Sequence, residues 1–210
     1  MEGGAAKAFL RAVGASSASP TIDGRSIYLR QPSTQDFPQW SALRAESRTF
    51  LQPWEPRWPE DDLSRISYRR RLKRYARETR NDRGFPCFLF KKSDDCLVGG
   101  LTLSNIRRGV AQSCSLGYWM GQHYAGQGYM RDAVEAVLPY VFGKMGLHRL
   151  EAACLPHNER SIGLLNATGF TKEGYARGYL RINGQWQDHV LFAITKEDWK
   201  NKPGYMVNGS

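Results

Sequence analysis

The alternation of apolar and polar residues predicts a strand near the start of the chain, followed by a helix. Residues 25–31 alternate between apolar and polar positions, which is the period of a strand with one buried face. Pro32 ends this strand. Ser33 or Thr34 can cap the next helix, which we expect to run towards Phe50.

The segment 51–59 contains three prolines and two tryptophans, so we expect an irregular loop there. Its tryptophans need a packing partner, and the loop can either form the wall of a binding pocket or pack onto the core. Both interpretations stay open. If it is a pocket wall, Trp54 and Glu55 are its candidate substrate-binding residues.

Residues 60–83 have the period of an amphipathic helix, with one apolar and one basic face. The basic face consists of Arg69, Arg70, Lys73, Arg74, Arg77 and Arg80. Between Arg65 and Arg83, nine basic and two acidic residues leave a local net charge of +7. Such a face is either solvated or binds the phosphates of RNA.

Strand-like and helical segments alternate in the rest of the chain. Strands are predicted at 85–91, 97–104, 111–120, 147–155, 170–174, 179–182 and 187–194. A helix is predicted over 128–143, where Pro139 should kink it or end it early, and another over 158–168. Asn183-Gly184 is typical of a type I′ hairpin.

These elements indicate one α+β domain over residues 21–200, with a central mixed, mostly antiparallel sheet of about seven strands flanked by helices. We expect residues 1–20 to be a disordered tail, with a transit peptide as the alternative, and 201–210 to be a flexible tail.

Composition narrows the class of protein. With 210 residues, of which 41% are hydrophobic and 24% charged, the chain can build a core. Its net charge of +10 points to an acidic partner, and no apolar run approaches the ~20 residues of a membrane span. The four cysteines show no metal-ligand spacing, and no secretory signal precedes the domain. We therefore expect a soluble cytoplasmic protein without a metal site or a membrane partner.

A glycine-containing loop, GQHYAGQGYMR at 121–131, lies between a predicted strand and a predicted helix. Gly126 and Gly128 permit a tight turn and leave N–H groups unobstructed in front of the positive end of the helix dipole. Such a loop binds a phosphate or pyrophosphate, although it can also be a simple turn. Because Arg131 stands where a third glycine is needed, it is not a dinucleotide fingerprint.

The pattern His123-x-x-Gly126-x-Gly128, followed by Asn158-x-x-Ser161 and a later Gly-Phe pair, resembles the GCN-type N-acetyltransferase (GNAT) superfamily. His123 departs from the usual Gln or Arg at the start of the pattern. The resemblance implies that acetyl-CoA is the co-substrate and that its pyrophosphate lies on the glycine loop. The cofactor-binding residues it implies are Trp119, Met120, His123, Tyr124, Ala125, Gly126, Gln127, Gly128, Tyr129, Met130, Asn158 and Ser161.

Longer segments, among them FLQPWEP, LGYWMGQHYAGQGYM and EGYARGYLRINGQWQDHVLFA, resemble ribosomal-protein alanine N-acetyltransferases of the RimJ type. This resemblance covers about residue 25 to residue 199. It implies direct acetyl transfer, in a ternary complex, to the N-terminal α-amine of a ribosomal protein. It also places Tyr175, Tyr179 and Trp186 on a hairpin that forms one wall of the acceptor groove, with core packing as the alternative for Trp186.

The reaction needs a neutral amine, a polarised carbonyl and a proton for the departing thiolate. Many superfamily members supply that proton from a tyrosine, but the matching position here is Leu165. Ser161 is the nearest replacement, and Glu173 resembles the catalytic acid proposed for the Rim group. Their structural alternatives are a helix-start residue and an exposed carboxylate.

Three functions remain open on this evidence. The first is a ribosomal-protein N-acetyltransferase, acting as a monomer or homodimer, with ribosomal RNA as a candidate partner of the basic face Arg69–Arg80. The second is an acetyltransferase for a small amine such as an antibiotic or polyamine. The third is a ribosome-assembly or RNA-binding factor with secondary transferase activity.

Overall fold

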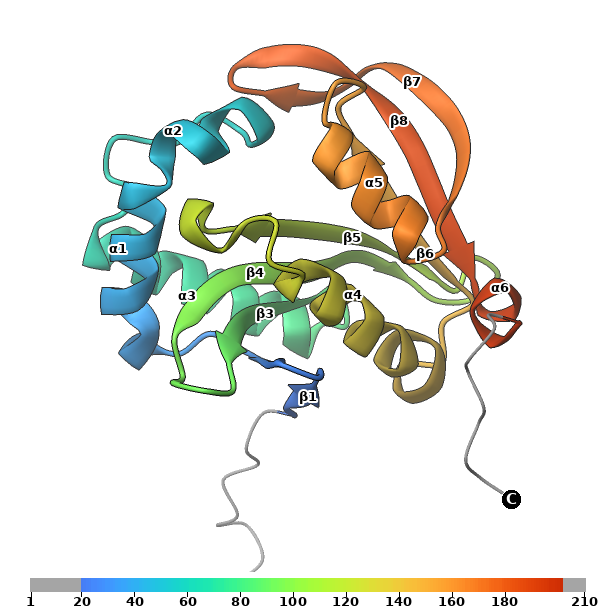
Figure 1. Cartoon of the computed structure of the whole chain (residues 1–210), viewed down its shortest axis with the longest axis horizontal. Coiled ribbons are helices and arrows are strands. Elements are labelled where there is room, and N and C mark those ends of the chain that lie inside the picture. Colours follow the sequence, from blue (N-terminus) through green and yellow to red (C-terminus); the bar gives the residue numbers. More distant parts are fainter. Residues whose placement is uncertain (1–19, 202–210) are drawn as a thin grey trace, which may run out of the picture.

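An eight-stranded sheet in the order β1-β2-β3-β4-β5-β6-β8-β7 is the centre of the fold (Figure 1). The computed structural model describes residues 20–201. The strands are β1 Ile22–Asp23, β2 Ile27–Arg30, β3 Gly84–Lys91, β4 Leu97–Arg107, β5 Ser113–Met120, β6 Arg149–Cys154, β7 Thr171–Ile182 and β8 Gln185–Thr195. Every neighbouring pair is antiparallel except β5 and β6, which are parallel.

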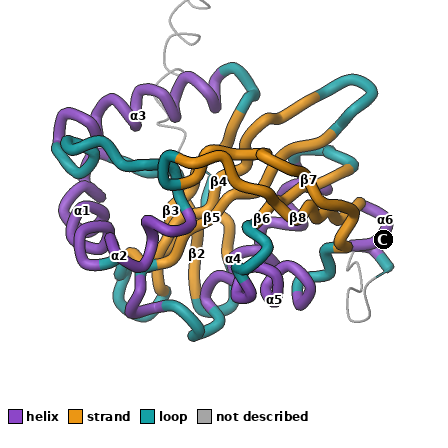
Figure 2. The backbone as a smooth tube through the Cα atoms, turned by 90° about the horizontal axis from the view of Figure 1, so that it is seen from above, coloured by secondary structure: helices purple, strands orange, loops and turns teal. Residues whose placement is uncertain are grey.

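Helices cover both faces of the sheet (Figure 2). They are α1 Phe37–Glu46, α2 Arg48–Leu51, α3 Arg65–Arg80, α4 Tyr129–Pro139, α5 Glu159–Ala167 and α6 Lys196–Lys200. Short segments add to them: η2 Thr34–Asp36, η3 Gln52–Trp54, η4 Gln122–Tyr124 and the π-helical η5 Tyr140–Lys144. The larger hydrophobic cluster packs α4 and α5 on one face, and a smaller one packs α1 and α3 on the other.

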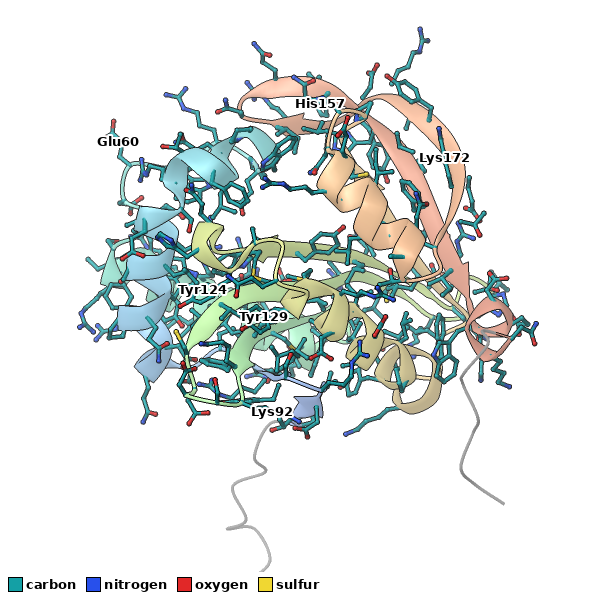
Figure 3. The ribbon with its side chains drawn as sticks, in the orientation of Figure 1. Glu60, Lys92, Tyr124, Tyr129, His157 and Lys172 are labelled. Atoms are coloured by element: carbon teal, nitrogen blue, oxygen red, sulfur yellow. The ribbon has the colours of Figure 1, made fainter. Side chains whose placement is uncertain are left out.

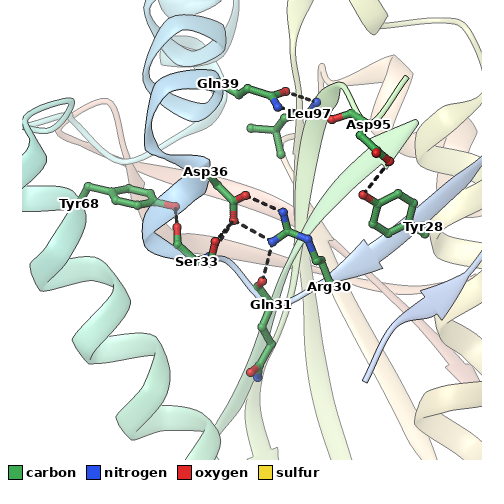
Figure 4. Close-up of polar contacts among 9 residues, drawn as sticks. All are labelled: Tyr28, Arg30, Gln31, Ser33, Asp36, Gln39, Tyr68, Asp95 and Leu97. Atoms are coloured by element: carbon green, nitrogen blue, oxygen red, sulfur yellow. Dashed lines mark hydrogen bonds and ion pairs between the residues drawn. The ribbon is translucent and has the colours of Figure 1, made fainter. Parts of the chain in front are cut away.

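A buried carboxylate joins the start of the sheet to the helices on the second face (Figure 4). Asp36 accepts two hydrogen bonds from the guanidinium of Arg30, at 2.6 and 2.8 Å, and one from the backbone N–H of Ser33 at 2.7 Å. The Tyr68 hydroxyl donates to the Ser33 carbonyl at 2.8 Å. These contacts tie β2, η2 and α3 together.

The α+β class and the mixed, mostly antiparallel sheet are confirmed, with eight strands in place of about seven. The two-residue β1 was not predicted, and the strands expected at 170–174 and 179–182 form one strand, β7, with two register shifts. The helix α6, capped by Thr195, was not predicted either. The tails expected at 1–20 and 201–210 lie outside the described residues, apart from their innermost residues.

Several predicted boundaries also shift. The helix expected over 60–83 begins only at Arg65, because the Ser64 side chain caps it by accepting from the N–H of Ser67. The proline-rich loop is not wholly irregular, since Pro53 lies in the first turn of η3, where its missing N–H costs nothing. The helix α4 does end early, at Pro139, and continues as the π-helical η5.

Candidate active site

The strands β5 and β6 separate partway along their length. They are paired from Ser113 with Arg149 to Leu116 with Ala152. Beyond that point β5 pairs only with β4, and β6 pairs only with β8. The fork leaves backbone N–H and C=O groups of both strands available to a ligand.

The end of β5 is shaped by two glycines on β4. Trp119 and Met120 pair with Gly100 and Gly99, and a Cβ atom on Gly100 would overlap the indole of Trp119. Trp119 also contacts the ring of Phe88 edge-on, with 6.4 Å between ring centroids. The expected cofactor residues Trp119 and Met120 therefore lie on the β5 arm of the fork.

The glycine loop follows directly from this arm. Gly126 and Gly128 have φ angles of 78° and 86°, and a Cβ on either would meet no atom within 4 Å. Gly128 is the N-cap of α4 and no side chain caps the helix, so the first N–H groups of α4 lack intrahelical partners. This is an exposed cradle for an anion at a helix N-terminus.

Side chains fix the loop in place. The Gln127 amide donates to the carbonyl of His123 at 2.6 Å, and the Tyr124 hydroxyl lies 3.1 Å from the sulfur of Cys96. Tyr124 and Tyr129, which precede and follow the glycines, have ring centroids 6.4 Å apart (Figure 3). Ala125 and Met130 complete the expected set, and Met130 is buried in the core.

A hydroxyl pair spans the fork. The Tyr118 hydroxyl on β5 lies 2.6 Å from Ser161 Oγ at the start of α5. Burial raises the pKa of Tyr118 to about 12, so the phenol stays protonated and can donate to Ser161. Burial also raises the pKa of the Cys154 thiol, beside Ser161, which disfavours the nucleophilic thiolate form.

The neighbouring helix supports this pair. Asn158 caps α5 by accepting the N–H of Ser161 through its side-chain oxygen at 3.2 Å, which leaves its amide N–H group for a ligand. Leu165 is fully buried, so the position matching the superfamily tyrosine belongs to the core.

Glu173 does not lie beside Ser161. Its carboxylate forms an ion pair with both terminal nitrogens of Arg149, the residue that begins β6, while Ser161 lies beside Cys154 at the other end of that strand. The hydrogen bond from Arg149 holds the pKa of Glu173 below its usual range. This ion pair favours the ionised form of Glu173, and the role of Glu173 as the catalytic acid stays a prediction.

The acidic residue of the proline-rich loop is part of a buried ion pair. Arg44 is 6% exposed and donates to both carboxylate oxygens of Glu55, at 2.6 and 2.7 Å. The indole N–H of Trp58 donates to the same carboxylate at 2.7 Å, and the Arg44 guanidinium lies 4.9 Å from the Trp119 ring centre. Glu55 thus connects the loop to the β5 arm of the fork.

The loop and the final hairpin meet above the fork (Figure 1). The N–H of Asn183 donates to the carbonyl of Glu55 at 2.9 Å, and the ring of Trp54 lies 5.5 Å from that of His157. Figure 3 places His157 at this junction. His157 therefore joins its own loop to the proline-rich loop through its contact with Trp54.

The three aromatic residues expected to bind the acceptor are not gathered together. Tyr179 lines an open groove of roughly 590 Å³ on the face opposite α4 and α5, together with Ser115 and Glu151. Tyr175 pairs with the core-facing Val190, and its hydroxyl donates to Asp188, so it lies on the other face. Trp186 is 69% exposed and lies on the same side of β8 as Val190.

Glu151 is a partner of two arginines. It accepts from Arg149 at 2.9 Å and from Arg107 at 2.8 Å. His148 pairs with Glu197 instead, at 3.3 Å.

Sequence reasoning missed Tyr118, Arg44 and His189. Tyr118 occupies a regular position of its strand, and nothing in the sequence indicates that α5 brings Ser161 next to it. Arg44 is one of many arginines in the chain, and only its burial distinguishes it. His189 looked like part of a regular strand, yet it is 2% exposed and polar.

Two kinds of feature are absent from the described residues. Within residues 20–201 no three His, Cys, Asp or Glu side chains are grouped to hold a metal ion. In the same part of the chain, no helix has both the length and the apolar character that a membrane crossing requires.

Comparison with known proteins agrees with this architecture. Residues 26–171 match the family model described as an acetyltransferase (GNAT) domain. The [Ribosomal protein uS5]-alanine N-acetyltransferase of Escherichia coli (strain K12) is 41% identical over 155 residues, which cover 74% of this chain and 80% of that protein.

Solved structures resemble the chain over nearly its full length. The ribosomal-protein-S5-alanine acetyltransferase of Vibrio fischeri has a TM-score of 0.78 and 31% identity, with 86% of this chain and 99% of that chain covered. RimJ of Mycobacterium smegmatis, in complex with CoA-disulfide, has a TM-score of 0.81 and 31% identity, with 86% and 89% covered. The chain belongs to the GNAT acetyltransferase family.

Proposed function

We propose that this protein transfers the acetyl group of acetyl-CoA to the α-amine of the N-terminal alanine of a ribosomal protein. The observation that carries the proposal is the fork between β5 and β6, with the glycine loop behind one arm and the Tyr118–Ser161 hydroxyl pair across it. The relative named for acetylating ribosomal protein uS5 on alanine supports this acceptor class.

The proposed roles follow from position. The loop N–H groups around Gly126 and Gly128 bind the pyrophosphate, and the open arm of β5 binds the pantetheine and the thioester carbonyl. Tyr118 donates to Ser161, whose own hydrogen is directed to the sulfur that leaves. The amine attacks the thioester directly, because the buried Cys154 thiol remains neutral.

The acceptor enters beneath the junction of the proline-rich loop and the hairpin. The hydrogen bond between Asn183 and Glu55 closes this side of the fork, so a chain end can reach the thioester more readily than a side chain on a folded surface. An α-amine also suits the site, because its pKa of about 8 leaves roughly a tenth of it neutral at pH 7.

The basic face of α3 is proposed to dock on ribosomal RNA. All six of its residues, from Arg69 to Arg80, are exposed, whereas Arg71 turns inwards to Asp62. We also propose that the protein is cytoplasmic, where reduced thiols are the rule; its four cysteines are unpaired.

The test is the intact mass of ribosomal proteins from cells that lack this protein. We expect one small-subunit protein to lose the mass of one acetyl group, and the purified enzyme to restore it on a peptide that begins with alanine. A matched peptide with a blocked N-terminus and a free lysine should not react. If no ribosomal protein changes and only small amines are acetylated, the proposal is wrong.

A further inference from the structure

One buried imidazole near the fork has no role in the chemistry described so far. His189 lies on β8, and its Nδ1 is 3.0 Å from the carbonyl oxygen of Gln187. A carbonyl oxygen can only accept, so Nδ1 carries a hydrogen and the neutral ring has its lone pair on Nε2. Nε2 has no hydrogen-bond partner among the described residues and is not sealed from solvent.

The register places His189 level with Ser161 but on the opposite face of the sheet. Cys154 pairs with Val190, and the Ser161 hydroxyl contacts Cys154. Val190 faces the cluster beneath α4 and α5, so His189, the adjacent residue on β8, faces the other side. A thioester held in the fork would have the hydroxyl pair on one side and the imidazole on the other.

The imidazole lies between two hollows on this open face. Its ring is 5.6 Å from that of Tyr179, which lines the larger groove. Gln187, whose carbonyl accepts from the ring, lines a smaller hollow of roughly 130 Å³ together with His157. A chain bound in the larger groove beside Tyr179 would lie next to a residue that contacts this ring.

The bulge that presents Tyr179 is held by a carboxylate. Asp188 accepts from the N–H of Gly178 and from the hydroxyl of Tyr175, each at 2.7 Å. These bonds fix the irregular part of β7 between Ala176 and Leu180, where four positions of β7 span two of β8. The contact between Tyr179 and His189 is therefore built into the hairpin.

We propose that Nε2 of His189 is the general base that takes the proton from the acceptor α-ammonium. This inference rests on the proposed function. The ammonium N–H bond breaks and its proton moves to Nε2, while the freed nitrogen lone pair forms the C–N bond with the acetyl carbon. The C–S bond then breaks and the leaving thiolate takes the hydrogen of the Ser161 hydroxyl, which solvent restores. The second proton of the new C–N nitrogen passes to solvent, and the imidazolium releases its proton through the groove.

The decisive variant is His189→Asn, because the Asn amide can still donate to the Gln187 carbonyl but offers no basic nitrogen. With a peptide that begins with alanine, we expect kcat to fall about a hundredfold, the usual scale of general-base catalysis, with coenzyme A affinity unchanged. His189→Gln provides a second variant. His148→Asn, at an exposed histidine paired with Glu197, is the matched control and should keep full activity.

A second acceptor separates basicity from structure. The same peptide carrying an aminooxy group in place of its α-amine is already unprotonated at neutral pH and needs no base. We expect His189→Asn to acetylate it at nearly the wild-type rate.

The outcomes are distinct. A defect that persists on the aminooxy peptide, or full activity of both His189 variants on the alanine peptide, overturns the role of His189 alone. An inactive wild-type enzyme on the alanine peptide overturns the proposed function itself.

Discussion

Gly126 and Gly128 are residues whose replacement should separate cofactor binding from folding. Both have positive φ angles that strain any other residue, and both face open space. We expect Gly128→Val to abolish measurable acetyl-CoA binding in calorimetry while costing about 1–3 kcal/mol of stability from backbone strain. The control is Gly163→Ala, a helical position with equally open surroundings. Unchanged affinity in a folded Gly128→Val protein would contradict the assignment of the loop.

The hydroxyl pair makes a kinetic prediction. Ser161→Ala and Tyr118→Phe each remove one hydroxyl from the 2.6 Å contact, so each should lower kcat with little change in acetyl-CoA affinity. Because the two residues act through one hydrogen bond, the double variant should be scarcely worse than Ser161→Ala. Steady-state kinetics and calorimetry on the three variants test this. Additive losses would show that the residues act independently.

Asp36 predicts a dependence of stability on pH. Burial alone would raise its pKa, but the hydrogen bonds from Arg30 and Ser33 lower it overall. A carboxyl with a lowered folded pKa stabilises the protein above its unfolded pKa of about 4, and this stabilisation is lost as pH falls through the folded value. We expect Asp36→Asn to lower the free energy of unfolding at pH 7 by about 2–3 kcal/mol.

The measurement is urea unfolding of both proteins at pH 7 and at progressively lower pH. The difference between them should shrink as the wild-type carboxyl becomes protonated. Asp23→Asn, at an exposed carboxylate 3.4 Å from Lys92, should change stability little at any pH. A difference that stays constant down to the lowest pH would argue against an ionised Asp36.

At the scale of residues, the sequence predicted the roles that depend on a residue's own backbone conformation. It did not predict the roles that are set by a partner distant in the sequence. The glycines of the loop carry their conformational requirement in their own identity. The ion pair that holds the Glu173 carboxylate is made with Arg149, which is 24 residues away and on another strand. The burial of His189 likewise depends on the curvature and bulge of the hairpin, which no local pattern encodes.

Among the elements, α3 has the surface whose proposed role can be tested most directly. If its basic face docks on RNA, replacing Arg70, Lys73, Arg74 and Arg77 with Gln should weaken ribosome association. Each lost phosphate contact should flatten the log–log salt dependence by roughly 0.7 to 0.9. Gln keeps the helix propensity, and the buried Tyr68 still anchors the helix, so activity on a short peptide should persist.

Salt-dependent cosedimentation with ribosomes measures the first effect, and peptide acetylation measures the second. An equal loss on the free peptide would place these side chains at the acceptor groove. Unchanged ribosome association would show that these side chains form a solvated face with no docking role.

The elements themselves were predicted better than their ends and irregularities. The pattern of apolar residues located β2 to β6, because each strand has at least one clearly buried face and β3 is buried on both. The same pattern predicted two strands in place of β7, because Gly174 and Gly178 are typical of strand ends. In the structure β7 continues past both glycines through bulges, and Asp188 holds the second bulge. The start of α3 depends on a single cap at Ser64.

At the scale of the whole molecule, the two faces of the sheet differ in how they are covered. The cluster under α4 and α5 runs from β1 to β8, whereas the cluster under α1 and α3 reaches only from Tyr28 on β2 to Trp119 on β5. The second face is therefore left open over β6 and β8, where the groove containing Glu151 and Tyr179 lies. This asymmetry separates the proposed cofactor side from the proposed acceptor side.

The parallel pairing of β5 with β6 has a consequence for the newly made chain. One edge of β5 pairs with β4, the strand that precedes it, but the other edge must wait for β6, whose Arg149 pairs with Ser113, 36 positions earlier in the chain. Until β6 has left the ribosome, the hydrogen-bonding edge of β5 is exposed, and an exposed edge invites pairing with another chain. During synthesis this edge is therefore open to pairing with another chain, and β6, one arm of the proposed active site, ends that exposure.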